Sequence, residues 1–444
     1  MMKNYDMIVI GGGPAGLAAA YKAKSAGKSV AVFENDLWGG TCPNRGCDPK
    51  KVLLSAVEAR DRTQQLQGKG FSEVPYVNWS ELEQFKETFT DPVSEGSKKG
   101  LDSAKIDTYH GEAKFISEHE LIFDGETIQA AKFVLATGQH PSILKISGAN
   151  NLLTSNEFLS LKKMPKSITF IGAGYIAFEL ANIANATGAE VHVVHHNDHP
   201  LKAFDGDFVN DMVEQMKQRG IQFHFNVDTE KVTRKGSDYQ ITGSDDFSLT
   251  TGLVICATGR IPSVEGLDLD AADVKVTKHG VQVNQFLQTT NPDIYAVGDV
   301  VDKKQPKLTP VAGFEANYAM GHLLGNVSDP ISYPAIPTLV YGSPKLAKVG
   351  VSIPEAEAAP DKYTISDQDL TGWFTYHRIN EPTAKAKIIF DKNHQIVGAT
   401  VLTEQADELI NLFTLAIDKK IDHEQVGQLI LGYPTVASDL EYLI

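Results

Sequence analysis

Cysteine is scarce in this chain, with three among 444 residues. So few cysteines exclude a disulfide-stapled scaffold of the secreted kind. Cations are also outnumbered: 41 basic against 56 acidic residues give a net charge of −15, which argues against a nucleic-acid backbone or an anionic membrane as partner. Long apolar runs are missing too, because the stretch from Met7 to Tyr21 is too short to span a bilayer and contains glycines.

The remaining composition is that of a globular protein, with 42% hydrophobic and 22% charged residues. A chain of 444 residues is too long for one core and should form two to four domains. A strand over residues 5–10 comes at once, which leaves no room for a signal peptide. We therefore expect a cytoplasmic protein, in which a dithiol can cycle.

Two of the three cysteines, Cys42 and Cys47, lie five residues apart in the stretch from Trp38 to Lys50. Pro49 and the residues to Glu58 have the pattern of a helix start, and a helix N-terminus stabilises a thiolate. A close pair in a cysteine-poor protein indicates redox chemistry. The alternatives are a structural disulfide or half of a metal site, and Cys256 is the only other cysteine.

A dinucleotide-binding pattern precedes the cysteine pair. An apolar strand over residues 6–10 leads into an Ala-rich helix over 17–26, and a second strand over 29–33 ends in Glu34, a carboxylate suited to ribose hydroxyls. The turn between the first strand and the helix has the G-x-G-x-x-G spacing at Gly11, Gly13 and Gly16. Strand, turn, helix, strand and acid in this order predict a nucleotide site, which the glycines alone would not.

The pattern recurs at residues 167–194, with a strand, a small-residue turn, a helix and a second strand. The turn residues are Gly172, Gly174 and Ala177. The segment His195-His196-Asn197-Asp198 replaces the single acid after the second strand, and an acid there would repel a 2′-phosphate. His196 and Lys202 could meet that phosphate, which favours NADPH over NADH, although paired surface histidines are often solvated loop residues.

Two strands end in Ala-Thr-Gly, over residues 133–138 and 253–259, and Cys256 inside the second should be a buried, inert thiol. A third strand, over 294–299, places Asp299 at its carboxyl end, where open parallel sheets bind ligands.

From Tyr333 onward, strands over 338–341, 384–390 and 395–402 surround a helix over 406–417. The apolar face of that helix needs a partner, which is either the core of the domain or a second subunit. The face is formed by Leu409, Ile410, Phe413 and Ile417.

Together these motifs resemble the flavoprotein disulfide reductases, the family of glutathione reductase, dihydrolipoamide dehydrogenase and mercuric reductase. The resemblance covers nearly the whole chain and implies an α/β fold with two Rossmann-like domains, one for FAD and one for NAD(P)H, and an α+β C-terminal dimerisation domain. It implies a homodimer in which the partner completes the active site. The domain boundaries it implies are 1–143 and 264–333 for the FAD-binding and central parts, 144–263 for NAD(P)H and 334–444 for dimerisation.

In this family's terms, Cys47 resembles the charge-transfer thiol beside the flavin and Cys42 the interchange thiol that attacks substrate. Lys50 and Glu179 resemble the ion pair near the flavin N5, and Tyr175 the ring over the nicotinamide pocket. No resident metal is expected. The cofactor contacts that the resemblance implies are Gly11, Gly13, Pro14, Ala15, Gly16, Glu34, Gly40, Thr41, Lys50, Ala136, Thr137, Gly138, Gly172, Gly174, Tyr175, Ile176, His196, Lys202, Gly259, Arg260, Gly298, Asp299, Thr309 and Ala312.

The C-terminus departs from the family pattern. Relatives carry His-Pro-Thr with a Glu five residues after the His, whereas this chain has Tyr433 and Ser438 at those places and Asp439 one residue further on. Tyrosine, with a reference pKa of about 10 against about 6.5 for histidine, can donate a proton at neutral pH but is a poor base. Some coenzyme A disulfide reductases use tyrosine in this role. Tyr433 is therefore our candidate acid.

Other departures concern the substrate. Tyr21 and Asn317 occupy places where glutathione reductases carry arginines, so a doubly charged glutathione disulfide should bind poorly. Asp48 follows Cys47 where relatives have an apolar residue; a carboxylate disfavours a neighbouring thiolate, and Arg45 is the candidate to offset it.

The sequence thus predicts an NADPH-dependent FAD enzyme that passes electrons through a Cys42–Cys47 disulfide to a small acceptor, most simply a disulfide. An NAD(P)H oxidase or a quinone or metal-ion reductase of the same fold is the alternative. A redox sensor whose cysteine pair switches conformation is a third hypothesis, against which stand two complete nucleotide fingerprints.

Overall fold

The computed structural model describes residues 3–444. Its chain forms two compact units. The first unit comprises residues up to 51, 84–142 and 259–332, and the second comprises 52–83, 143–258 and 333–444. The four-part division predicted from the sequence stays a prediction. Among the described residues, no helix has the length and apolar character needed to cross a membrane.

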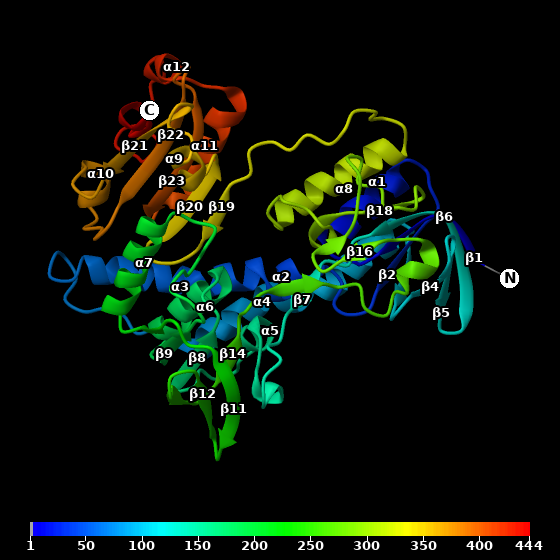
Figure 1. Ribbon diagram of the computed structural model, residues 1–444, viewed down its shortest axis with the longest axis horizontal. Helices are drawn as coiled ribbons and strands as arrows, with labels where there is room; N and C mark the ends of the chain where they lie inside the picture. Colours follow the sequence, from blue (N-terminus) through cyan, green and yellow to red (C-terminus); the bar gives the residue numbers. More distant parts are fainter. Residues whose placement is uncertain (1–2) are drawn as a thin grey trace. The chain divides into compact units, whose positions relative to one another are not determined.

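The first unit is built on a seven-stranded sheet with the order β3-β2-β1-β6-β5-β4, to which β18 adds along β6 (Figure 1). β1, β2, β3, β6 and β18 pair in parallel, and β4 and β5 form an antiparallel edge. Both faces of the central strands are apolar and buried, as a parallel sheet requires. The strands are β1 Lys3–Ile10, β2 Val30–Glu34, β3 Asp107–His110, β4 Lys114–Ser117, β5 Glu120–Phe123, β6 Glu126–Leu135 and β18 Ile294–Ala296.

Helices α1 (Pro14–Ser25) and α8 (Thr309–Leu323) pack against each other in this unit. Small side chains of α1 allow the helix to lie close to the sheet, with Ala19, Ala20 and Ala23 fully buried. The unit also contains the short pairs β7 (Gln139–Pro141) with β15 (Arg260–Pro262) and β16 (Val276–Thr277) with β17 (Gly280–Val281), and the helix α2 (Thr41–Arg45). Helix α3 (Cys47–Gln65) begins in this unit and ends in the second, whereas α4 (Trp79–Ser103) begins in the second unit and ends in this one.

The second unit begins with a four-stranded parallel sheet in the order β10-β9-β8-β14. Helix α6 (Tyr175–Ala186) follows β8 and is buried along most of its length, and α7 (Gly206–Gln218) follows β9. A three-stranded antiparallel sheet, β11-β12-β13, is inserted before β14. The strands are β8 Ser167–Ile171, β9 Glu190–Val194, β10 Gln222–His224, β11 Thr229–Lys235, β12 Asp238–Gly243, β13 Ser248–Thr251 and β14 Val254–Cys256.

The C-terminal part of the second unit is a five-stranded antiparallel sheet in the order β19-β20-β23-β22-β21, with α11 (Ala406–Lys419) packed on β20 and β23. Leu409, Ile410 and Phe413 of α11 are fully buried, so this face belongs to the core of the unit. The strands are β19 Thr338–Val340, β20 Lys345–Gly350, β21 Tyr363–Asp369, β22 Lys385–Asp391 and β23 Ile396–Thr403. Short helices complete the part: α9 Ile353–Glu357, α10 Phe374–His377, α12 His423–Gly427 and α13 Leu440–Leu443.

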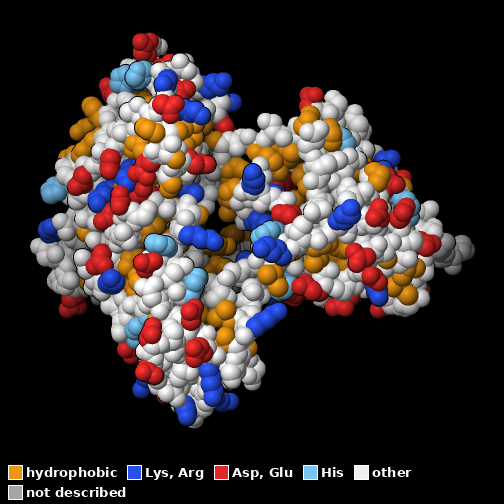
Figure 2. Space-filling view, viewed as in Figure 1, with side chains coloured by type: hydrophobic (Ala, Val, Ile, Leu, Met, Phe, Trp, Pro, Cys, Tyr) orange, Lys and Arg blue, Asp and Glu red, His pale blue; other side chains and the backbone are white. Residues whose placement is uncertain are grey.

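The α/β fold class with two Rossmann-like sheets and an α+β C-terminal part is confirmed. Two local predictions were wrong. The helix after the cysteine pair begins at Cys47 rather than at Pro49, and the two Ala-Thr-Gly strands end before that tripeptide, at Leu135 and Cys256. On the face seen in Figure 2, acidic and basic side chains are intermixed, so the negative net charge is not gathered into one patch there.

Candidate active site

The first glycine turn is held tightly against the sheet. Gly11 has φ +108°, and a Cβ there would lie 2.3 Å from the Ala136 carbonyl oxygen. A Cβ on Gly16 would lie 1.9 Å from the Gly11 oxygen, so α1 approaches the turn only because this residue is glycine. Pro14 occupies the first helical turn, and Gly13 caps α1 without a side-chain hydrogen bond. The first N–H groups of α1 are therefore available to an anion such as a pyrophosphate.

Glu34, the last residue of β2, is buried and receives one backbone hydrogen bond on each oxygen. The Gly12 N–H donates to Oε2 and the Asp36 N–H to Oε1, both at 2.8 Å. Burial raises the pKa of this carboxyl group, and the bond from Gly12 opposes that shift. Each carboxylate oxygen has a further lone pair, so Glu34 can still accept from the hydroxyls of a ribose.

Asp299 lies in a 3₁₀ turn (Gly298–Val300) directly after β18. No hydrogen bond reaches its carboxylate from the residues that the structure describes, and burial raises its pKa. The hydroxyl of Thr137, just past the end of β6, is also buried without a partner among these residues. Such acceptors and hydroxyls at the carboxyl ends of parallel strands fit the polyol chain of FAD.

Two residues that the sequence analysis missed position this turn. Glu315, on α8, is fully buried; its Oε2 accepts from the Gly298 N–H at 2.7 Å and its Oε1 from the Lys303 ammonium at 2.6 Å. The side chain of Lys303 is 5% exposed, so this is a buried ion pair. A glutamate within the otherwise apolar start of α8 was the signal available in the sequence.

Cys42 lies in α2, and Cys47 is the first residue of α3. Both are free thiols; Cys42 is half-buried and Cys47 exposed. A hydrogen bond from the Cys42 thiol lowers the pKa of Cys47 to about 6, aided by the Thr309 hydroxyl and the Lys50 charge. The same bond, followed by burial, raises the pKa of Cys42. At neutral pH Cys47 is thus the thiolate and Cys42 holds the proton.

Different polar groups lie beside the Cys42 and Cys47 sulfurs. The Asp48 carboxylate lies 3.9 Å from the Cys42 sulfur, and the Thr309 hydroxyl, at the start of α8, lies 3.8 Å from the Cys47 sulfur. Arg45 forms an ion pair with Asp36. The negative charge beside Cys42 is that of Asp48, and Arg45 is engaged with a different carboxylate.

The second glycine turn repeats the geometry of the first. Gly172 has φ +107°, and a Cβ there would lie 2.5 Å from the Ala257 carbonyl oxygen. Gly174 caps α6, which opens with Tyr175 and Ile176, and the Tyr175 ring is 49% exposed. The first N–H groups of α6 therefore offer the same kind of anion site.

His196 and Lys202 are both exposed and follow β9. The His196 ring stacks edge-on against His195, with centroids 4.4 Å apart, and its Nε2 lies 3.0 Å from the Asn197 amide nitrogen. Their position past the carboxyl end of β9 is where an adenosine ribose and its substituents meet this fold.

Glu179, on α6, is buried, and its Oε1 accepts a 3.0 Å hydrogen bond from the Tyr341 N–H. Lys50 belongs to the first unit and Glu179 to the second. Their ion pair stays a prediction.

Tyr433 is 76% exposed in the segment before α13. Ser438, at the place of the family's glutamate, uses its hydroxyl to close a turn with Thr435. Asp439 is buried, its Oδ2 has no partner among the described residues, and burial raises its pKa. Because Ser438 has no carboxylate, it cannot be an acidic partner of the exposed Tyr433.

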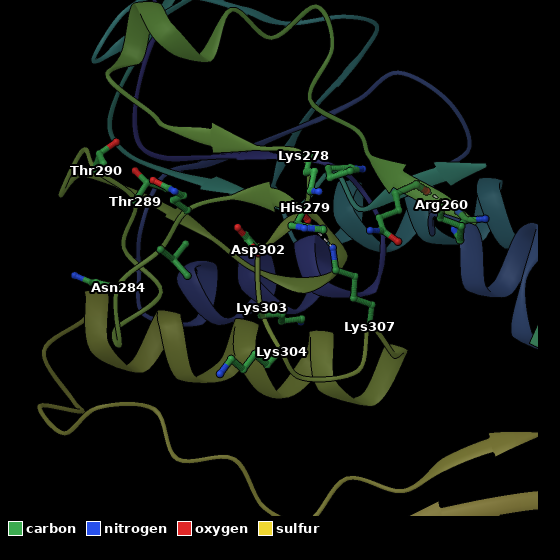
Figure 3. Close-up of a pocket in the computed structure, with 14 residues that line it drawn as sticks. Arg260, Lys278, His279, Asn284, Thr289, Thr290, Asp302, Lys303, Lys304 and Lys307 are labelled. Atoms are coloured by element: carbon green, nitrogen blue, oxygen red, sulfur yellow. Dashed lines mark hydrogen bonds between the residues drawn. The ribbon is translucent and has the colours of Figure 1, made fainter. Parts of the chain in front are cut away.

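A groove of about 940 Å³ in the first unit is rich in cations (Figure 3). Arg260 donates to the Gln139 carbonyl at 2.5 Å, and Lys307 donates to the carbonyls of His279 and Asp299 at 3.0 and 2.8 Å. Lys307 therefore ties the turn that carries Asp299 to His279, whereas Arg260 binds the β7 segment. Of the groove residues only Arg260 was predicted to serve a cofactor.

The chain matches the family model described as pyridine nucleotide-disulphide oxidoreductase over residues 5–316 and its dimerisation domain over 336–443. A glutathione reductase from Burkholderia cepacia is 30% identical over 98% of this chain and 97% of its own length. A glutathione reductase from Nostoc sp. is 32% identical over 94% of both chains, and a mercuric reductase from Staphylococcus aureus is 30% identical over 99% of this chain and 81% of its own.

Among solved structures, a Cu(II) complex of a mutant of the HOCl-induced flavoprotein disulfide reductase RclA from Escherichia coli superposes with a TM-score of 0.89 at 23% identity. That match covers 100% of this chain and 99% of the other, and at this identity it shows the fold alone. With two family models covering nearly the whole chain and curated relatives at 30% identity, the protein belongs to the pyridine nucleotide-disulphide oxidoreductases, enzymes that bind FAD and use NAD(P)H.

Proposed function

We propose that this enzyme passes electrons from NADPH through FAD to a Cys42–Cys47 disulfide, and from the resulting dithiol to a small disulfide substrate. The observation that carries the proposal is the placement of the two sulfurs: Cys47 opens helix α3 beside the Thr309 hydroxyl, and Cys42 lies in α2 beside the Asp48 carboxylate. Cys47, at the N-terminus of α3, has a lowered pKa, whereas the pKa of Cys42 is raised. A reductase needs this difference between the sulfurs, because one sulfur faces the flavin and the other attacks the substrate.

When bound, FAD would supply the redox chemistry, which is acceptance of hydride from the nicotinamide and reduction of the protein disulfide. The remaining work falls to residues of this chain. Lys50 and the Thr309 hydroxyl stabilise the Cys47 thiolate. Cys42 passes its proton to the Cys47 thiolate and attacks one sulfur of the substrate, forming a mixed disulfide as the first half of the substrate leaves. Cys47 gives this proton up again before its own attack, and it replaces the proton that the departing thiol receives. Cys47 then attacks the Cys42 sulfur, which restores the protein disulfide and releases the second thiol.

The leaving thiol needs a proton. In the proposed dimer, Tyr433 of the partner subunit supplies it, and its exposure in the chain is compatible with that role. A tyrosine hydroxyl suits an acid better than a base at neutral pH.

We further propose NADPH rather than NADH as the electron donor. His196 and Lys202 are exposed past the carboxyl end of β9, and His195 rather than an acid directly follows that strand, with Asp198 three residues further on. A steady-state comparison tests this choice: kcat/KM should be higher for NADPH than for NADH with the same acceptor, and equal values would contradict it.

Reduction of a metal ion is the second candidate function. It is favoured by the similarity to mercuric reductases and by the lack of a histidine at the place of Tyr433. No three metal-ligating side chains gather among the described residues, so a metal would enter as substrate at the thiols. Oxygen and quinones, which take electrons directly from flavin, belong to the same alternative.

One experiment separates these functions. The purified enzyme is supplied with NADPH and tested with low-molecular-weight disulfides, quinones, oxygen and metal ions, as wild type and as Cys42→Ser. The proposal predicts disulfide turnover that Cys42→Ser abolishes. Full activity of Cys42→Ser toward oxygen or quinones, together with no disulfide turnover by the wild type, would favour the alternative.

A further inference from the structure

Asp48 places a carboxylate beside the sulfur that meets the substrate. It lies in the first turn of α3, directly after Cys47, and its Oδ1 is 3.9 Å from the Cys42 sulfur. The Asp48 side chain is exposed and Cys42 is half-buried, so the carboxylate stands on the solvent side of the pair. Any molecule that reaches the Cys42 sulfur approaches Asp48 as well.

The charge of Asp48 has no ion-pair partner among the described residues. Arg45, the nearest candidate in the sequence, forms an ion pair with Asp36. The charge of Lys50 acts on Cys47, the other sulfur of the pair. A negative field therefore remains at the position where a mixed disulfide with Cys42 would form.

Resting on the proposed disulfide reductase activity, we propose that Asp48 selects the substrate by charge, favouring disulfides with cationic groups near the S–S bond over disulfides with anionic ones. When Cys42 attacks, a new S–S bond joins its sulfur to one half of the substrate, and the other half leaves as a thiol. Groups two or three bonds from the substrate sulfur then lie within a few ångströms of Asp48. At this distance, near the surface, the unit charge of Asp48 changes the affinity for a charged substrate by about 3- to 10-fold. The affinity rises for a cationic substrate and falls for an anionic one.

Three small disulfides of similar size provide the test: cystamine, which is dicationic, hydroxyethyl disulfide, which is neutral, and dithiodipropionate, which is dianionic. The leaving thiols differ in acidity, so the informative quantity is the change in the kcat/KM ratio between variants. We expect Asp48→Asn to lower the ratio of cystamine to dithiodipropionate by about 10-fold, since it removes both an attraction and a repulsion. Raising the salt concentration should also lower the ratio of cystamine to dithiodipropionate in the wild type, because salt screens the charge of Asp48.

Two variants serve as controls. Asp48→Glu keeps the charge and should keep the ratio, and Asp91→Asn removes an exposed carboxylate of α4 in the first unit that forms no ion pair among the described residues. The visible flavin spectrum verifies that each variant is a folded holoenzyme. An unchanged ratio in Asp48→Asn, or an equal change in Asp91→Asn, overturns the inference and leaves the proposed function standing. Failure of the wild type to reduce any of the three disulfides overturns the proposed function itself.

Discussion

At the scale of single residues, the two active-site sulfurs differ because their surroundings differ. Cys47 sits at the N-terminus of α3, near Lys50 and the Thr309 hydroxyl, whereas Cys42 is half-buried and near Asp48. The sequence indicated the redox pair and the thiolate-stabilising helix. It did not indicate that Arg45 would pair with Asp36, because that contact depends on how the chain folds between the two residues.

The protonation state of Cys47 gives a pH prediction. Its pKa is lowered to about 6, so the thiolate is present above that pH and is lost as the pH falls through it. In the two-electron-reduced enzyme, the long-wavelength thiolate–flavin absorbance should therefore disappear with a midpoint near pH 6. Cys42→Ala has no redox disulfide, so its thiolate–flavin absorbance is recorded in the oxidised enzyme. There the midpoint should rise, because the hydrogen bond from Cys42, the largest cause of the lowered Cys47 pKa, is removed.

The same titration tests whether Cys47 is the thiolate. Cys47→Ser should abolish the band at every pH. A band that survives this substitution would show that Cys47 is not the thiolate beside the flavin. A midpoint that Cys42→Ala leaves in place would show that Cys42 does not lower the pKa of Cys47.

Tyr433 leads to a second prediction at this scale. Tyr433→Phe removes the hydroxyl while keeping the ring, and we expect it to lower kcat for disulfide reduction by about 100-fold, the lower end of the usual effect of a general acid. Electron transfer from NADPH to ferricyanide does not require a thiol to be protonated and should change little. Tyr442→Phe, another exposed tyrosine near the C-terminus, is the matched control. An unchanged disulfide kcat in Tyr433→Phe would remove this residue from the mechanism.

At the scale of elements, the two glycine fingerprints were predictable because each depends on local spacing. Gly11 and Gly172 show the physical reason, since a Cβ on either would collide with a carbonyl oxygen of a neighbouring strand's end. The contact between Glu315 and the Gly298 N–H was not predictable in the same way. It joins α8 to a turn seventeen residues earlier, and a lone glutamate in a helix usually marks a solvent-facing side.

That contact supports the third prediction. Glu315→Gln would leave the buried Lys303 ammonium without its counter-charge, which typically costs about 3–5 kcal/mol. We expect a lower free energy of unfolding and faster loss of FAD, because the Gly298–Asp299 turn loses its anchor. Glu408→Gln, an exposed position on α11, should change the free energy of unfolding by less than about 0.5 kcal/mol.

The double variant Glu315→Leu with Lys303→Met removes both charges and should recover part of the lost stability. Chemical denaturation of the apoprotein measures the stability term, and flavin release on dilution measures the binding term. Equal unfolding free energies for wild type and Glu315→Gln would refute the role assigned to the pair.

At the scale of the whole molecule, the family was predictable because its motifs are spread along the entire chain, and the matches to the family models over residues 5–316 and 336–443 confirm the family. The identity of the acceptor was not predictable in the same way. It depends on charges such as Asp48 that stand next to the motif, and on residues such as Tyr433 that act, in the proposed dimer, on the other subunit's cysteines. These are properties of assembled surfaces rather than of spacing along one chain.

The predicted ion pair of Lys50 and Glu179 is the test that belongs to this scale, because one residue is in each unit. Lys50→Met and Glu179→Gln should each slow flavin reduction by NADPH, measured in single turnovers; glutamine keeps the oxygen that accepts from the Tyr341 N–H. If the two side chains act as a pair, the double variant should be slowed by less than the product of the single effects, with a coupling energy of about 1 kcal/mol or more. Effects that multiply without coupling would show that each residue acts alone, and the electron path would then depend on each unit separately.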